Sequence, residues 1–437
     1  MCARRIRTRE LACLIVLLTF SSAQDVRAQV DEMPEPTSTS VVTEQLPETG
    51  IPGQAAGGGI GGPASVPAQL RGEQATGPSY RFPGFDRLLE PWFHIKDRLA
   101  DEHRFIVGGD YNALYQGASE TLTGNDDAAS GVFRLYGDWT LFGEQDVSSG
   151  SLIFKGENRS RLGTDVPPSQ LGFDAGYLGI PGVLFNDNGW FLSNLYWEQA
   201  LFGKVGVVVG RLEPDSFIDV SGYANPWIGF QNLAINVNPT IPFPDVGFGM
   251  AAGYVIEDQW VVKGGFYDAN GVPTRIGMFE EGGELFTHLE ISWAPTRAER
   301  FLREIHVAGW HVDERENAGV PESWGIAVSG NWTFDNRWMP FFRVGWSEGG
   351  APLMHRAATC GVLRYFACRG DLAGIGLSWE DPSDRSLPEQ NSFEFFYRVQ
   401  LAQNLAVTPS VQVLINPALN PNDDALTIFG LRGRLTF

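Results

Sequence analysis

Apolar and polar residues alternate with a period of two from about residue 104 to the last residue. In "SWGIAVSGNWTF", one face carries Trp324, Ile326, Val328, Trp332 and Phe334, and the other carries Gly325, Ala327, Ser329, Asn331 and Thr333. This period predicts β-strands, because successive side chains of a strand point to opposite faces. A large apolar face opposite a small polar one is typical of strands that separate lipid from an aqueous interior.

The same two-sided pattern recurs in "GVFRLYGDWTLF" and "NSFEFFYRVQL". Candidate strands begin near residues 104, 131, 150, 171, 190, 204, 230, 246, 259, 285, 304, 324, 338, 371, 391, 405 and 426, with the weakest alternation near 171 and 230. Because membrane barrels of single bacterial chains favour an even strand number, we predict about sixteen. Links alternate between short turns and long loops, and "SEGGAPLMHRAATCGVLRYFACRG" is expected to be a long loop.

The alternation continues to the C-terminal Phe437 in "ALTIFGLRGRLTF". A closed barrel must pair its last strand with its first, so an ordered aromatic terminus fits a barrel. A soluble β-sandwich also alternates, but it would bury one face in a dry core. Charges on the other face of strand after strand suit a wet interior better. The predicted fold is therefore an all-β transmembrane antiparallel barrel, spanning residues 104–437.

The N-terminal residues differ in composition from the barrel. Residues 1–28 combine basic residues with the apolar run "LACLIVLLTF", which is typical of an export signal. Residues 29–80 are rich in Pro, Gly, Ser and Thr and are predicted to be a disordered leader. Residues 81–103 are predicted to contain a short amphipathic helix, with Pro91 breaking or restarting it; its apolar positions are Phe85, Leu88, Leu89, Trp92, Ile95 and Leu99.

Charge and composition narrow the possible partners. The net charge is -20, and loss of residues 1–28, which carry five Arg against Glu10 and Asp25, would make it -23. An exported acidic chain is not suited to bind nucleic acid through nonspecific charge. After the signal, the sequence has no run of about 18 apolar residues. A membrane role must therefore use strands.

Two cysteines follow the predicted signal, Cys360 and Cys368, in "CGVLRYFAC". In an oxidising compartment we expect a disulfide between them that closes a small loop. Two thiols at this spacing lack the further ligands of a metal site. The sequence also shows no nucleophile, base and acid at matching strand positions, so we expect neither an enzyme nor a cofactor.

Three stretches resemble the OprB-type carbohydrate-selective porin family. They are Trp92, Lys96 and Leu99 ahead of the strand "RFIVGGDYNALYQ", then "VGRLEPDSFIDVSGYANPWIGFQNLAINVNP", then "FYRVQLAQNLAVTPSVQVLINPALNPNDDALTIFGLR". Phe93 and His94 stand where the family usually has a Gly pair. The resemblance implies a sixteen-stranded outer-membrane channel of a Gram-negative bacterium, monomeric or trimeric, which passes small sugars by diffusion. A general channel, or one selective for anions or organic acids, is the alternative.

Such a channel would contact lipid, small sugars and, through Phe437, the barrel-assembly machinery. A pore for neutral sugars needs bidentate donors, carboxylates and aromatic planes at its narrowest ring. The charged residues with lumen parity that we predict for the constriction are Arg134, Asp138, Lys155, Glu157, Glu290, Arg343, Glu394, Arg398, Arg432 and Arg434. A simpler interpretation is that these residues only pair with each other and keep the interior wet.

Overall fold

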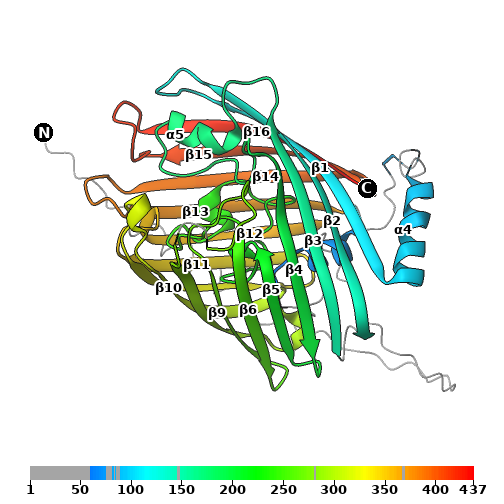
Figure 1. Cartoon of the computed structure of the whole chain (residues 1–437). Coiled ribbons are helices and arrows are strands. Elements are labelled where there is room, and N and C mark those ends of the chain that lie inside the picture. The colour runs from blue at the N-terminus through cyan, green and yellow to red at the C-terminus, as the bar shows by residue number, and fades with distance from the viewer. Residues whose placement is uncertain are drawn as a thin grey trace, which may run out of the picture. The chain divides into compact units, whose positions relative to one another are not determined.

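The computed structural model describes residues 60–74, 81–82, 84, 89–144, 148–279, 282–366 and 370–437. Within these residues, sixteen strands form one closed antiparallel barrel in which sequential strands are neighbours (Figure 1). The predicted fold class and a strand number of about sixteen are confirmed.

The strands are β1 (Phe105–Ala118), β2 (Asp127–Glu144), β3 (Ser148–Arg161), β4 (Gly189–Leu201), β5 (Val205–Leu212), β6 (Gly247–Ile256), β7 (Trp260–Asp268), β8 (Leu285–Trp293), β9 (Arg303–Val312), β10 (Ser323–Trp332), β11 (Trp338–Glu348), β12 (Met354–Phe366), β13 (Asp371–Pro382), β14 (Gln390–Ala402), β15 (Leu405–Ile415) and β16 (Ala425–Thr436). The helices are α2 (Val66–Gln74), α4 (Glu90–His103), α5 (Pro168–Asp174) and α6 (Leu233–Asn236), with single 3₁₀ turns η1 (Pro214–Ser216), η2 (Arg297–Glu299) and η3 (Glu316–Ala318).

The barrel closes where β1 meets β16. The two strands pair from Asp110 opposite Thr436 to Ala118 opposite Ile428. Phe437 extends the seam, since its backbone N–H donates to the Gly109 carbonyl at 2.8 Å and its carbonyl accepts from the Gly109 N–H at 3.0 Å. The ladder therefore has no open edge, and the pairing of the last strand with the first is confirmed.

The two faces of the wall differ as the alternation predicts. On the outer face, the side chains of Leu289, Trp324 and Phe395 are 65%, 50% and 42% exposed. On the inner face, the predicted lumen residues Arg134, Arg343 and Arg432 are buried, and Arg398 is buried with them. In a bilayer the apolar face meets acyl chains, and the polar backbone groups are satisfied between strands.

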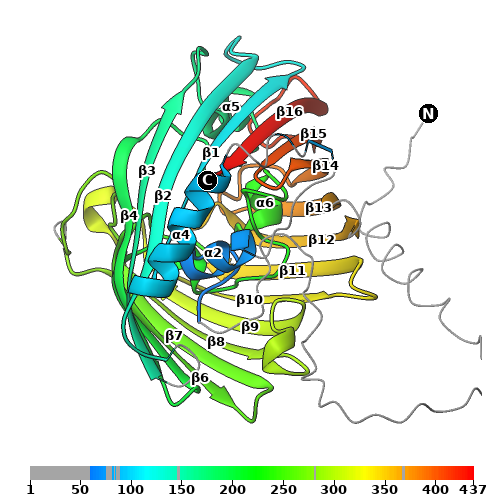
Figure 2. The ribbon, with the colours of Figure 1, turned by 90° about the vertical axis from the view of Figure 1, so that its right-hand side faces the viewer.

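Within the described residues, the connection between β3 and β4 contacts the inner face through Tyr177 and Pro181, and two further parts of the chain lie inside the ring of strands. One is residues 213–246, between β5 and β6, which contain α6 and are called the inner loop below. The other is residues 60–74, which contain α2 and are called the inner segment. Figure 2, which looks along the barrel, shows α2 and α6 within the ring. At Gly345 of β11, an added Cβ would come within 2.1 Å of Thr240 Oγ1, so the wall needs glycine where the inner loop lies against it.

Three predictions about strand positions were wrong. Residue 171 lies in α5, and residue 230 lies in the inner loop just before α6, so neither belongs to a strand. The stretch expected to be a long loop contains β12, and its link to β11 is only residues 349–353. The outward face of β12 carries Arg356 and Arg364 near its ends instead of continuous apolar residues, which hid its alternation. Arg364 lies over the Trp338 ring at 4.6 Å.

A prediction for the N-terminal residues was also wrong. Residues 60–74 were predicted to belong to a disordered leader, but they form α2 and pack inside the barrel. The prediction for residues 29–59 and 75–80, like the signal at 1–28, falls outside the described residues. Helix α4 lies within the range 81–103, with Pro91 in its first turn. Cys368 also falls outside the described residues, so the disulfide to Cys360 stays a prediction.

Among the described residues, no helix has both the length and the apolar character needed to cross a membrane.

The outer face gives a first prediction. Leu289 lies at the centre of β8, so Leu289→Arg would place a charge near the middle of the bilayer and lower the free energy of unfolding by about 2–4 kcal/mol. Urea unfolding in lipid vesicles measures this cost. Leu122→Arg is the control, because Leu122 is a half-exposed residue of the β1–β2 loop. Equal effects of the two substitutions would contradict a lipid-facing position for Leu289.

Candidate solute-binding site in the barrel interior

The inner loop is held by a buried cluster around Asp219. Arg343 on β11 pairs with its carboxylate at 3.0 Å, the His306 ring on β9 lies 2.9 Å from it, and Ser329 on β10 donates to it at 2.6 Å. Burial raises the pKa of Asp219, but Arg343 and the His306 hydrogen bond outweigh burial and hold this pKa below its ordinary value. Three adjacent strands thus fix one carboxylate of the loop.

The wall also supplies hydrogen-bond partners for backbone groups of the inner loop. Glu394 on β14 accepts hydrogen bonds from the backbone N–H groups of Gln231 and Asn232, both at 2.8 Å. Arg432 on β16 donates to the Gly229 carbonyl at 2.9 Å. Glu290 on β8 accepts from the Asp219 N–H at 2.7 Å. Charged side chains of the wall therefore replace the water that an exposed loop would use.

A second polar cluster joins the wall to both inserted parts. Asp110 on β1 accepts from Arg134 at 2.8 Å and from Arg434 at 2.9 Å. Arg434 also donates to Glu73 of the inner segment at 3.0 Å. The Arg134 guanidinium lies 3.7 Å from the centroid of the Trp227 ring, which belongs to the inner loop. This stacking orients the indole plane inside the barrel.

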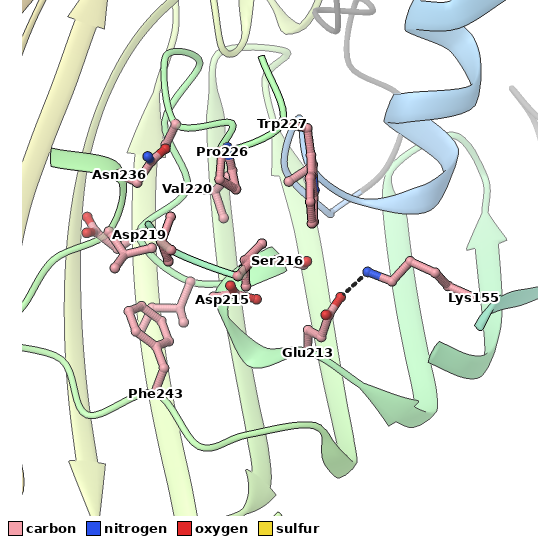
Figure 3. A pocket seen from close by; sticks show the side chains of 16 residues that line it. Lys155, Glu213, Asp215, Ser216, Asp219, Val220, Pro226, Trp227, Asn236 and Phe243 are labelled. Atoms are coloured by element: carbon pink, nitrogen blue, oxygen red, sulfur yellow. Dashed lines mark hydrogen bonds and ion pairs between the residues drawn. The ribbon is translucent and has the colours of Figure 1, made fainter. Parts of the chain in front are cut away.

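The first hollow lies between the inner loop and β3 and has an empty volume of about 690 Å³. Figure 3 shows Lys155 reaching Glu213 across it, with Asp215, Trp227 and Phe243 around it. Its lining therefore combines aromatic side chains with three carboxylates, those of Glu213, Asp215 and Asp219, and one amine.

The second hollow lies between the inner segment and strands β14–β16 and has an empty volume of about 510 Å³. Trp227 lines it as well as the first hollow. Within the described residues, buried Arg398 has no ion pair, and its hydrogen bond to the Gly370 carbonyl is long, at 3.4 Å. Both polar atoms of the Asn404 side chain are buried without a hydrogen-bond partner. Buried polar groups without partners beside a hollow suit a polar ligand.

All ten residues predicted for the constriction have side chains on the inner side of the wall. Those that touch the inner loop or inner segment are Arg134, Lys155, Glu290, Arg343, Glu394, Arg432 and Arg434. Glu157 pairs instead with Lys155 and Arg159, Asp138 is buried on β2, and Arg398 lines the second hollow. Most of the predicted constriction residues therefore contact the inner loop or the inner segment.

Sequence reasoning missed four residues of this site: Glu73, Asp110, Asp219 and Trp227. Three of them lie outside strands, where alternation gives no information. Asp110 has the inward parity of β1 and could have been found by that parity. Asp219 and Trp227 stood in the stretch "DSFIDVSGYANPW", whose resemblance to the porin family was the available signal.

Known proteins agree with this architecture. Residues 323–437 match the family model described as carbohydrate-selective porin, OprB family. Among solved structures, the chain is similar to OprB of Pseudomonas putida in its high-pH structure, with a TM-score of 0.64 and 15% identity over 79% of this chain and 97% of that one. A triple mutant of the Rhodopseudomonas blastica porin gives a TM-score of 0.48 and 13% identity over 76% and 100%. No curated protein matches the chain.

The closed sixteen-stranded barrel with its apolar outer face has the fold of the porin class of outer-membrane proteins. Within this class, its last 115 residues, 323–437, are similar to the carbohydrate-selective OprB family. The fold and this match indicate a channel rather than an enzyme.

The Asp219 cluster gives the second prediction. Asp219→Ala leaves Arg343 buried without its carboxylate, so the free energy of unfolding should fall by about 3–5 kcal/mol. The matched control is Asp187→Ala, because the Asp187–Arg161 pair is partly exposed and should contribute only about 0–1 kcal/mol. Urea unfolding of both variants compares these costs, and similar losses would show that the inner loop does not depend on Asp219.

Proposed function

We propose that this protein is a passive outer-membrane channel for small neutral sugars. The observation that carries the proposal is the pair of hollows that share Trp227, each lined by charged or amide groups from the wall and the inserted parts. A sugar offers hydroxyl groups at its edge and apolar C–H groups on its ring faces. An aromatic plane with hydrogen-bonding groups beside it matches both features.

The balance of charge favours neutral solutes over anions. Across both hollows the lining includes three cations, Lys155, Arg398 and Arg434, and four carboxylates, Glu73, Glu213, Asp215 and Asp219. An anion would therefore meet four repelling groups and three attracting ones along these hollows. A neutral polyol can hydrogen bond to both signs of charge. The similarity of residues 323–437 to carbohydrate-selective porins supports the same solute class.

Among the residues predicted for the constriction, we propose that Lys155, Arg398 and Arg434 contact the solute. The others in the set position the inner loop and the wall. Solute contacts in a diffusion channel must stay weak, because a tightly held sugar would block the pore. A monomeric or trimeric state and recognition of Phe437 by the assembly machinery also stay proposals.

The third prediction concerns Trp227. Trp227→Ala removes the aromatic plane shared by the hollows, so the apparent affinity of maltotriose, read from its block of ion current in planar bilayers, should fall roughly two- to tenfold. Trp190→Ala is the control, since Trp190 on β4 is 71% exposed on the outer face. Equal sugar block in the two variants, or no block of the unmodified channel by any sugar, would refute the proposal.

One observation favours the alternative, a channel for anions or organic acids. Arg398 has no ion pair within the part of the chain that the structure describes. Reversal potentials in KCl gradients separate the two functions. Weak ion selectivity together with sugar block supports the sugar channel, whereas strong anion selectivity that glucose and maltose leave unchanged supports the alternative.

A further inference from the structure

The inner wall of the barrel carries an apolar patch that a water-filled pore would leave wet. Lumen-facing side chains of this patch come from β2–β6 and are Tyr136, Ile153, Tyr196, Val208 and Ala251. All five are buried. The inner segment covers the patch with Ile60, Val66 and Leu70, which belong to the same hydrophobic cluster, together with residues of the inner loop. Removing this cover would expose apolar surface to water.

The fit between patch and segment is close. Added Cβ atoms at Gly206 of β5 and Gly253 of β6 would come within 2.8 and 2.6 Å of the Ile60 side chain. At Gly108 of β1, an added Cβ would lie 2.8 Å from Leu70 Cδ2. The wall thus has glycine under two of the three apolar side chains of the segment, which lets the segment lie directly on the strands.

Polar side chains on the same face of α2 also bind the wall. The Gln69 amide donates to Tyr136 Oη at 2.6 Å and to Asp110 at 3.2 Å. Glu73 accepts from Arg434 at 3.0 Å and from the Tyr136 hydroxyl. Burial raises the pKa of Glu73 above its ordinary value, although Arg434 opposes this rise. The segment is also bonded to the inner loop, because the Gly62 N–H donates to the Ser216 carbonyl at 2.8 Å.

The inner segment borders both hollows. Ala64 lines the first hollow, and Gln69, Gly72 and Glu73 line the second. Any solute that passes between these hollows therefore moves along the surface of residues 60–74. An α-helix with its side chains is about 10 Å across, which is a large share of the lumen of a sixteen-stranded barrel.

We propose that residues 60–74 are a resident wall of the solute route, which narrows the channel and sets the largest solute that passes. The apolar cover and the polar contacts keep the segment in place while solutes move past it. Its carboxylate, Glu73, supplies the acceptor that faces the donors of the second hollow. The identity of the solute as a sugar rests on the proposed function, but the narrowing itself does not.

The fourth prediction tests the narrowing with the full chain and a deletion of residues 60–74. Because the deletion removes a helix about 10 Å across, KCl conductance in planar bilayers should rise about twofold or more, and larger polyethylene glycols should enter the pore. A deletion of residues 30–44, equal in length, is the control. Unchanged conductance and an unchanged polymer limit would overturn the proposal. Neither measurement depends on sugar preference, so failure of the sugar channel would not alter this result.

A second variant decides the question if the deletion prevents folding. Ala64→Cys in a chain with Cys360→Ser and Cys368→Ser places a thiol on the first hollow. A bulky methanethiosulfonate reagent should then lower single-channel conductance in one step. The control is Gly84→Cys, since an added Cβ at Gly84 has no atom within 4 Å. Rapid modification of the Ala64→Cys thiol without any fall in conductance, or no modification of it, would show that the segment does not line the route.

Discussion

A loop that enters a barrel takes its backbone polar groups away from bulk water, and this constraint governs the interior of the protein. Each buried N–H or carbonyl left without a partner costs free energy, so the wall must supply partners. Glu394 and Arg432 supply them for residues 229–232, and Glu290 and Arg343 supply them for the N–H and carbonyl of Asp219. Charged side chains suit this task, because hydrogen bonds to ionised groups are the stronger ones.

The same charged residues explain how a barrel with a polar inner face can be filled by an inserted loop. Sequence parity places Arg343, Glu394 and Arg432 on the inner face, which reads as the lining of an open pore. In the structure they bind the inner loop instead, and a different and smaller group of charged wall residues lines the two hollows. Charge on the inner face of a barrel therefore indicates polar surroundings but does not distinguish solute from an inserted loop.

The barrel was predictable from sequence because a period of two is a local signal that repeats in most strands. The alternation signal was misleading at β12, where Arg356 and Arg364 interrupt the apolar face. It was also misleading near residues 171 and 230, where short apolar runs belong to inserted loops. The sequence pattern did not reveal the inner segment, because Ile60, Val66 and Leu70 stand among glycine, proline and alanine. Asp219 and Trp227 acquire their roles only when strands far apart in sequence meet around them.

The proposed preference for neutral solutes is supported by how these opposed charges are arranged. Asp110 lies between Arg134 and Arg434, and Glu213 lies against Lys155. These carboxylates offset much of the attraction that the three cations would exert on an anion. Hydroxyl groups still find donors and acceptors there, because a paired guanidinium keeps further N–H groups. The stacked indole of Trp227 adds an apolar plane without net charge. The proposed route would therefore hold a polyol by weak contacts, as diffusion through a selective pore requires.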